Sequence, residues 1–179
     1  MFRCLGRMAI IGMTLSWLLG VSNHTARAGG PPSNENPAES NLAIIVNTTN
    51  PVEGMSLPEL RKVFLGERSH WPNGRRITLV MMEPGQPERK ALIREVCQMN
   101  ENDFSRHFLQ GVFTGEVFVS PKTLASQVGV RKFVFNVPGA IGYIRASDVD
   151  STIKVIRVDG RLPSDREYNL HIPPRAVQQ

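Results

Sequence analysis

The chain has 179 residues, of which 41% are hydrophobic, 21 are basic and 16 are acidic, giving a formal net charge of +5 at neutral pH. Three of the basic residues, Arg3, Arg7 and Arg27, lie within the first 28 residues, so the remaining 151 residues carry 18 basic and 16 acidic side chains. Their net charge of +2 removes the main support for nucleic-acid binding, whereas 151 residues are enough for one domain with a hydrophobic core.

The first 28 residues have the three parts of a secretory signal peptide. A basic region holding Arg3 and Arg7 is followed by the uncharged apolar stretch Met8 to Val21, and Ala26-Arg27-Ala28 places small residues at a cleavage site. A membrane-spanning helix needs about 20 apolar residues, and this stretch is shorter. No cysteine follows it at the position of a lipid anchor. We predict cleavage after Ala28, export to the periplasm and no stable membrane anchor in the cleaved protein.

The exported part begins and ends with polar segments. Residues 29–41 are rich in Gly, Pro, Ser and Asn and predict a flexible leader. Residues 161–179 are polar and contain three prolines, which predicts a loosely held C-terminal tail. The domain is therefore expected to span residues 42–160.

The domain opens with signals for a strand and a helix. Leu42 to Val46 is a continuous apolar run, which predicts a strand buried on both faces. Ser56 and Glu59 form a capping box at the start of a helix, and Gly66 is placed to end that helix. A polar turn at residues 71–74 leads into a predicted strand, Ile77 to Met82. Residues 83–87 then break the strand before a second helix.

The rest of the domain continues the alternation of helices and strands. Apolar spacing predicts a helix over residues 88–99, and Asn100 is placed to cap the next helix. Ser120-Pro121 predicts the start of a helix that reaches Val134. Ala140 to Ile144 and Ile153 to Val158 predict strands. This alternation is typical of an α/β fold in which a mixed sheet is flanked by helices.

Catalytic and metal-binding patterns are weak in this sequence. The histidines of the exported part, His70, His107 and His171, are widely spaced and form no i, i+4 pair, so we expect no metal site and no cofactor. No G-x-S-x-G motif occurs, and Cys97 falls among the apolar positions of a predicted helix, where a free cysteine usually packs. We therefore expect a protein that is not an enzyme.

Three loops precede predicted helices and are candidates for anion binding. They are Thr48 to Asn50, Gly85-Gln86 and Gly115 to Ser120. Helix amino termini present free N–H groups and a positive dipole end, which favour phosphate or sulfate. A carboxylate at Glu88, at the start of one of these helices, would compete with an incoming anion. Ordinary helix caps explain the same residues equally well, so both interpretations remain open.

Two segments resemble the phosphate-binding proteins of bacterial phosphate ABC transporters, and more closely the short, single-lobe proteins grouped with them. The first, residues 56–77, contains Phe64-Leu65-Gly66 followed by Trp71, and the second is Val137-Pro-Gly-Ala-Ile-Gly-Tyr-Ile144. The resemblance covers roughly residues 42–158. It implies one lobe of a type II periplasmic binding protein, with a mixed sheet flanked by helices. Relatives with two lobes close them on phosphate, and this chain has room for one.

The ligand loop departs from the family pattern. Relatives carry an Arg and then a D-G-S-G-T run after the strand that corresponds to residues 77–82. In this chain the Arg position falls on Met82, the Asp on Pro84, the Ser on Gln86 and the Thr on Glu88, and only Gly85 is retained. Loss of the Arg removes a bidentate contact to the anion, so the resemblance implies weak binding.

Three hypotheses follow. The first is an exported lobe that binds phosphate or another small oxyanion through Thr48, Thr49, Gly85, Gln86 and Arg89, linked to phosphate ABC transport or to a protein partner that completes the cleft. The second is a ligand-free periplasmic protein-interaction module that kept the lobe fold and an exposed apolar patch. The third, a hydrolase, requires a Cys or Ser within reach of a His.

Overall fold

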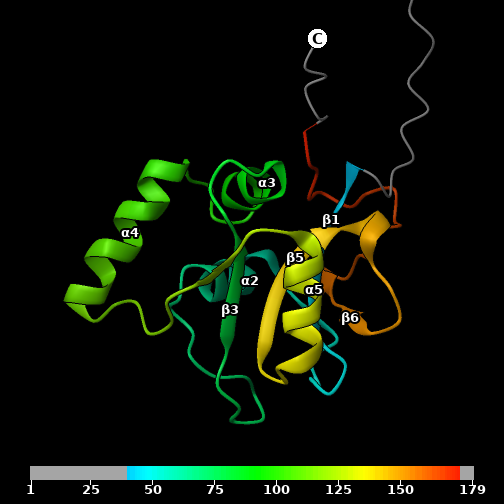
Figure 1. Ribbon diagram of the computed structural model, residues 1–179, viewed down its shortest axis with the longest axis horizontal. Helices are drawn as coiled ribbons and strands as arrows, with labels where there is room; N and C mark the ends of the chain where they lie inside the picture. Colours follow the sequence, from blue (N-terminus) through cyan, green and yellow to red (C-terminus); the bar gives the residue numbers. More distant parts are fainter. Residues whose placement is uncertain (1–39, 174–179) are drawn as a thin grey trace, which may run out of the picture. The chain divides into compact units, whose positions relative to one another are not determined.

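The computed structural model describes residues 40–173, so the predicted signal peptide and most of the predicted leader lie outside the described residues. In chain order the elements are β1 (Leu42–Asn47), β2 (Gly54–Met55), α2 (Leu57–Phe64), β3 (Thr78–Met82), α3 (Pro87–Glu95), α4 (Glu101–Thr114), β4 (Lys122–Leu124), α5 (Gln127–Asn136), β5 (Ala140–Arg145), the 3-10 turn η1 (Ala146–Asp148), β6 (Ile153–Val155) and β7 (Arg157–Val158). Figure 1 shows their arrangement.

The main sheet is mixed and has five strands in the order β4-β3-β5-β1-β6. β3 runs parallel to β4 and to β5, whereas β1 runs antiparallel to both of its neighbours, β5 and β6. Leu42 of β1 therefore pairs with Arg145 at the end of β5, and Val46 pairs with Ile141 near the start of β5. The carboxyl ends of β3, β4 and β5 lie together along one side of the sheet, called here its carboxyl edge. The carboxyl end of β1 lies at the opposite ends of these strands.

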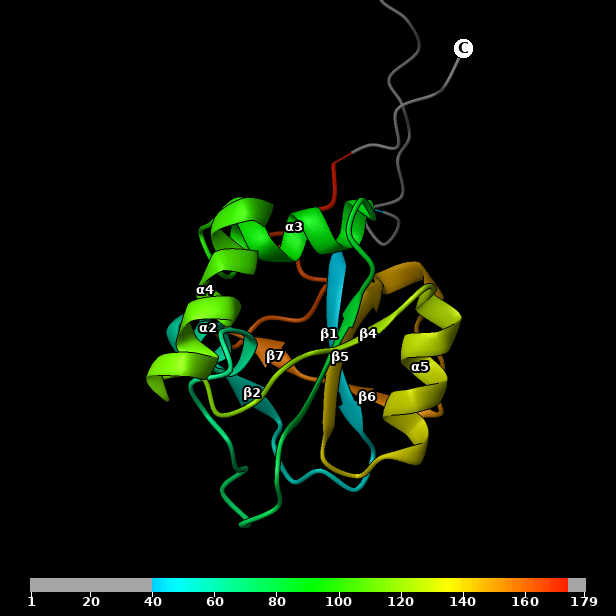
Figure 2. The same cartoon turned by 60° about the vertical axis from the view of Figure 1, so that its left-hand side comes forward.

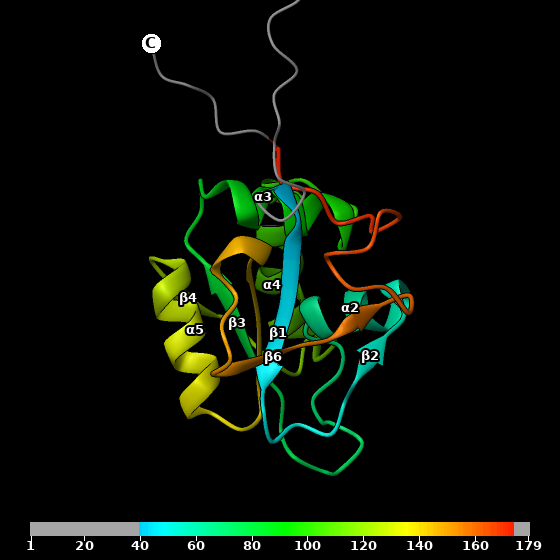
Figure 3. The ribbon, with the colours of Figure 1, turned by 90° about the vertical axis from the view of Figure 1, so that its right-hand side faces the viewer.

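Helices cover both faces of this sheet, as the sequence pattern predicted. α5 lies on one side and α2 on the other (Figures 2 and 3). All six residues of β1 are buried, in agreement with its continuous apolar run. Gly142 lets α5 approach β5 closely, because a Cβ atom there would lie 2.8 Å from Val130 Cγ1.

The predicted helix caps are present. The Ser56 side chain accepts a hydrogen bond from the Glu59 N–H, and the Glu59 carboxylate accepts one from the Ser56 N–H, which completes the capping box of α2. Gly66 follows this helix with φ of +75°. Asn100 Oδ1 accepts a hydrogen bond from Asp103 N at 2.9 Å and caps α4.

Several predicted boundaries are wrong. The segment after Ser120-Pro121 forms strand β4 instead of a helix, and α5 begins only at Gln127, because Ser126 supplies the cap by accepting from Gly129 N at 3.1 Å. The helix that begins after Gln86 ends at Glu95, well before residue 99. The predicted strand over residues 153–158 is two short strands, β6 and β7, which belong to different sheets.

The packed domain also extends beyond residues 42–160 at both ends. Tyr168, Leu170 and Ile172 are each 2% exposed and belong to the hydrophobic core. Leu42 N donates a hydrogen bond to Leu170 O at 2.9 Å, and Asn41 Nδ2 donates to Pro163 O at 2.6 Å. The expected polar tail is thus part of the domain as far as the structure describes it. Apolar residues at every second position are a strand-like pattern that the surrounding prolines and charges obscured.

Trp71 connects the two segments that carry the family resemblance. Its side chain is 2% exposed, and its Nε1–H donates to Gly139 O at 2.9 Å. Gly139 O also accepts from Thr78 N at 3.0 Å, at the start of β3. A Cβ atom at residue 139 would lie 2.2 Å from Arg76 O, so glycine is required there. The two sequence motifs therefore meet at one corner of the sheet.

Candidate functional site

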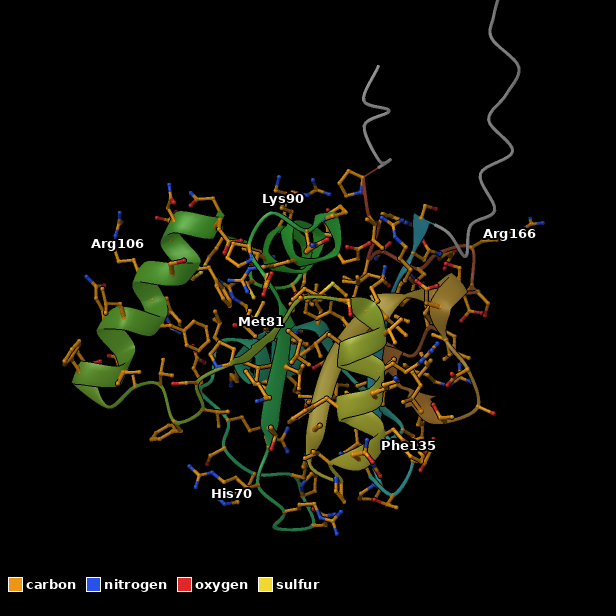
Figure 4. The ribbon with its side chains drawn as sticks, in the orientation of Figure 1. His70, Met81, Lys90, Arg106, Phe135 and Arg166 are labelled. Carbon is orange, nitrogen blue, oxygen red and sulfur yellow. The ribbon has the colours of Figure 1, made fainter. Side chains whose placement is uncertain are left out.

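A groove lies where the carboxyl ends of β3, β4 and β5 meet the amino termini of α3 and α5. The residues that line it are Gln86, Ala125, Ser126, Gln127, Val128, Arg131 and Asp148. The carboxyl edge of parallel strands is the usual ligand edge of α/β folds, and the helix amino termini there favour anions. Lys90 on α3 marks this end of the molecule in Figure 4, with Met81 of β3 in the interior.

Glu88, in the first turn of α3, forms a buried ion pair beside this groove. Its side chain is 2% exposed, and its Oε1 accepts from Arg145 Nε at 2.6 Å and from Gln127 Nε2 at 3.2 Å. Gln127 Oε1 in turn accepts from Arg145 N at 2.7 Å. These contacts join α3, α5 and the end of β5. The carboxylate supplies a fixed negative charge at a helix amino terminus, where the helix dipole favours it.

Arg89 does not reach the groove. Its guanidinium is bound by the Glu101 carboxylate, with Nε–Oε1 at 2.9 Å and Nη2–Oε1 at 2.7 Å, and Nη1 donates to Met82 O at 2.7 Å. The guanidinium also lies 5.4 Å from the centroid of the Phe104 ring. Arg89 is 6% exposed, so its charge ties α4 to α3 and β3.

Both backbone groups of Met82, the residue onto which the sequence resemblance placed the family's Arg, form hydrogen bonds with side chains. Its carbonyl accepts from Arg89, and its N–H donates to the Tyr143 hydroxyl at 3.0 Å. Burial raises the pKa of Tyr143, so this phenol stays protonated at neutral pH. Side chains of α3 and β5 therefore fix the position of the backbone at the end of β3.

Gln86 lines the groove, and Gly85 lies directly before it in the turn that leads into α3. Gly85 has φ of +94°, a conformation that favours glycine, and Gln86 is the N-cap residue of α3. The Gln86 side chain makes no capping hydrogen bond to the first N–H groups of α3. In α5, by contrast, Ser126 caps Gly129 N.

Thr48 and Thr49 lie at the opposite edge of the sheet, because β1 runs antiparallel to β5. Thr49 Oγ1 donates to Asn47 Oδ1 at 2.7 Å and accepts from Arg75 Nη1 at 3.4 Å. Asn47 Nδ2 donates to the carbonyl of Val134 at 2.9 Å, near the end of α5. His70 marks the neighbouring loop, far from Lys90, in Figure 4. The structure therefore separates the five predicted residues: Gly85, Gln86 and Arg89 are near one edge, and the threonines are at the other.

Sequence reasoning missed Gln127, Arg145 and Glu101. A charged residue directly after the apolar run of β5 was the available signal for Arg145, since the carboxyl ends of parallel strands lie at one edge. Nothing local identifies Glu101 as the partner of Arg89, because their pairing depends on how α3 and α4 pack.

The described residues offer few other reactive groups. Within residues 40–173, no group of three or more His, Cys, Asp and Glu side chains could hold a metal ion. Cys97 is buried, and burial raises the pKa of its thiol to about 12, so it is not a thiolate nucleophile at neutral pH. Across the same range, no helix combines the length and apolarity needed to cross a membrane.

Solved structures of phosphate-binding proteins share this fold. An ABC-type phosphate transport receptor from Vibrio cholerae is 20% identical with a TM-score of 0.57, over 69% of this chain and 48% of that chain. A protein described as a phosphate ABC transporter substrate-binding protein from Clostridium perfringens, solved with bound phosphate, is 23% identical with a TM-score of 0.56, over 68% of this chain and 46% of that one. PstS from Borrelia burgdorferi is 14% identical with a TM-score of 0.57, over 74% and 55%.

The likeness confirms the predicted fold class, a mixed sheet flanked by helices that shares its fold with part of these phosphate-binding proteins. The matched part of this chain spans about half the length of these proteins, between 46% and 55%. The sequence matches no family model and no curated protein. The resemblance to phosphate-binding proteins of ABC transporters thus holds at the level of the fold.

Proposed function

We propose that this chain is an exported periplasmic lobe that binds a small oxyanion, with phosphate as the first candidate, at the groove between α3 and α5. The observation that carries the proposal is the convergence of two helix amino termini at the carboxyl edge of β3, β4 and β5. Gln86 and Ser126, the N-cap residues of these helices, both line the groove. A partner, such as a component of a phosphate ABC transporter, supplies the second wall of the cleft. No catalytic step is involved.

The anion contacts in this proposal come from backbone N–H groups instead of a guanidinium. Arg89 is committed to Glu101, and Arg131 donates to Asp148 O at 2.9 Å and pairs with Asp150 at 3.2 Å. Glu88 and Arg145 neutralise each other. A hydrogen bond from a backbone N–H to an oxyanion contributes about 1.5–3 kcal/mol, but no guanidinium adds an opposite charge here, so binding in the millimolar range is expected for the isolated lobe.

Substitution of Ser126 with Asp is expected to abolish a phosphate-induced rise in melting temperature. Asp caps a helix as well as Ser, so α5 is retained, but its charge repels the anion at the groove. The measurement is a thermal-shift titration with phosphate and sulfate, in which ligand at about 100 times its dissociation constant adds about 2.7 kcal/mol of stability to the unsubstituted protein.

The matched control is Asn100→Asp. This change also adds a charge at an N-cap, on α4, and Asn100 is not among the residues that line the groove. It should leave the phosphate shift intact. If neither anion shifts the melting temperature of the unsubstituted protein at tens of millimolar, the oxyanion proposal fails.

Export is testable separately. The full chain expressed in a Gram-negative bacterium should be recovered from the periplasmic fraction, with an intact mass that begins at Gly29. Substitution of Ala28 with a bulky residue such as Leu should leave the precursor uncleaved, because signal peptidase requires a small residue there. A mature mass that retains residues 1–28 would contradict the predicted cleavage.

The second candidate, a ligand-free interaction module that keeps the lobe fold, is favoured by the state of Glu88 and Arg89. Both side chains are buried, and both are paired within the protein. The position of a ligand anion at α3 is thus filled by the chain's own carboxylate. This candidate predicts that the unsubstituted protein unfolds cooperatively without any anion and that no anion raises its melting temperature.

A further inference from the structure

α4 carries an apolar ridge on its outer face. The helix packs inward through Phe104, which is 1% exposed, and through Phe108. Its outer face presents Leu109 at 65% exposure, Val112 at 54% and Phe113 at 84%, spaced three and four residues apart. Phe118, directly beyond the helix end, is 57% exposed. These four residues form the α4 ridge, and large apolar side chains this exposed in a group usually mark an interface.

α4 ends at Thr114 with Gly115 as its C-cap, and three of the four ridge residues lie in its second half. Gly115 caps the helix in the left-handed conformation, with φ of 75°. Val117 then packs against Gly111, where a Cβ atom would lie 2.4 Å from Val117 Cγ2. The return of the chain at this end therefore fixes α4 against the domain, and the ridge is held outward. In Figure 1 α4 stands at the periphery of the molecule, away from the main sheet.

We infer that the α4 ridge binds a second copy of this chain, with the two α4 helices packed antiparallel about a two-fold axis that passes their outer faces between Leu109 and Phe113. This arrangement pairs Leu109 with Phe113 of the second copy, and Phe113 with Leu109 of the second copy. It also brings Arg106 beside Glu116 of the second copy. Arg106 is 64% exposed at its side chain, makes a 3.5 Å ion pair with Asp103 of its own helix and lies on the outer side of α4 (Figure 4), and Glu116 is exposed. The inference does not depend on anion binding at the groove.

Charge and area both fit self-association. The first turn of α4 is acidic, with Glu101 and Asp103, and pairing about this axis keeps these turns of the two copies apart. The ridge offers roughly 450 Å² of apolar surface per copy, from the area of large apolar side chains and their exposed fractions. Complete burial of the four ridge residues in both copies sets an upper limit of about 900 Å² of apolar surface, just below the ~1,000 Å² of a small specific interface. A dimer of this size is weak and depends on concentration.

The test is sedimentation analysis of the protein purified from cells that express the full chain, from 5 to about 500 µM in phosphate-free buffer, a range that brackets a weak dimer. The unsubstituted protein is expected to shift from monomer to dimer over this range. Phe113→Ser should raise the dimer dissociation constant at least tenfold, because an aromatic residue at the centre of an interface usually dominates binding. Its melting temperature should change little, since Phe113 is largely exposed.

The matched control is Phe135→Ser on α5. Phe135 is 52% exposed and lies on a different helix, well away from Arg106 in Figure 4. It should leave the dissociation constant unchanged. Equal effects of the two substitutions would mean non-specific association and would overturn the inference.

A charge exchange tests the orientation of the pair. Arg106→Glu and Glu116→Arg should each weaken the dimer, because each places like charges side by side, and the double variant should restore it. A protein that stays monomeric across the whole concentration range overturns the inference, as does a double variant no better than either single one.

Discussion

Substitution of Glu88 with Gln is expected to lower the free energy of unfolding by about 3–5 kcal/mol. Gln keeps the shape of the side chain but removes the charge that accepts Arg145 Nε at 2.6 Å. The Arg145 side chain is only 16% exposed and would keep its charge without this carboxylate. The loss arises because this mostly buried charge no longer faces the carboxylate that accepts from its Nε, and chemical denaturation monitored by circular dichroism measures it.

Glu95→Gln is the control for this substitution. Glu95 pairs with Arg94 at 2.7 Å, a distance similar to that of the buried pair, but the two side chains are 31% and 57% exposed. Solvent screens such a pair, and its loss should cost less than about 1 kcal/mol. Equal losses for Glu88→Gln and Glu95→Gln would show that burial of the first pair has no energetic consequence.

Substitution of Tyr168 with Ala is expected to cost about 3–5 kcal/mol, as for other large aromatic side chains removed from a core. The residue is 2% exposed, and its hydroxyl donates to Leu42 O at 2.7 Å. Tyr168→Phe should cost about 1–2 kcal/mol, because it keeps the ring and removes only the hydrogen bond. The difference between the two variants separates packing from hydrogen bonding.

Phe135→Ala provides the comparison, since that ring is half-exposed and its loss should change stability by no more than about 0.5 kcal/mol. If Tyr168→Ala were as mild as Phe135→Ala, residues 161–173 would behave as a tail that contributes nothing to the domain. The hydrogen bonds of Leu42 and Asn41 to this segment predict the opposite.

The features that the sequence predicted well are those with local causes. The capping box at Ser56 depends on a residue three positions away, and the buried strand at residues 42–46 depends on its own apolar run. The fold class followed from the alternation of such elements and from two family motifs, which meet at the hydrogen bond between Trp71 and Gly139.

The candidate site was predicted less well because its geometry depends on contacts between distant residues. The direction of β1 decides where Thr48 and Thr49 lie, and an apolar run carries no information about direction. Arg89 has the same local signal whether it binds an anion or Glu101, which is contributed by the next helix. Strand β4 was missed because a Ser-Pro pair favours a helix start, while pairing with β3 favours a strand.

The pairing of β1 with strands near the end of the chain affects when this protein can fold. β1 is the first strand of the domain, yet its partners β5 and β6 come near the end of the chain, and residues 168–172 also pack onto its start. Such pairings close long loops, which makes folding slow compared with a chain whose neighbours in sequence are neighbours in space. Most of the polypeptide must therefore be available before β1 can be enclosed between β5 and β6. The strand order thus postpones the enclosure of β1 until late in synthesis, which is compatible with the export proposed above.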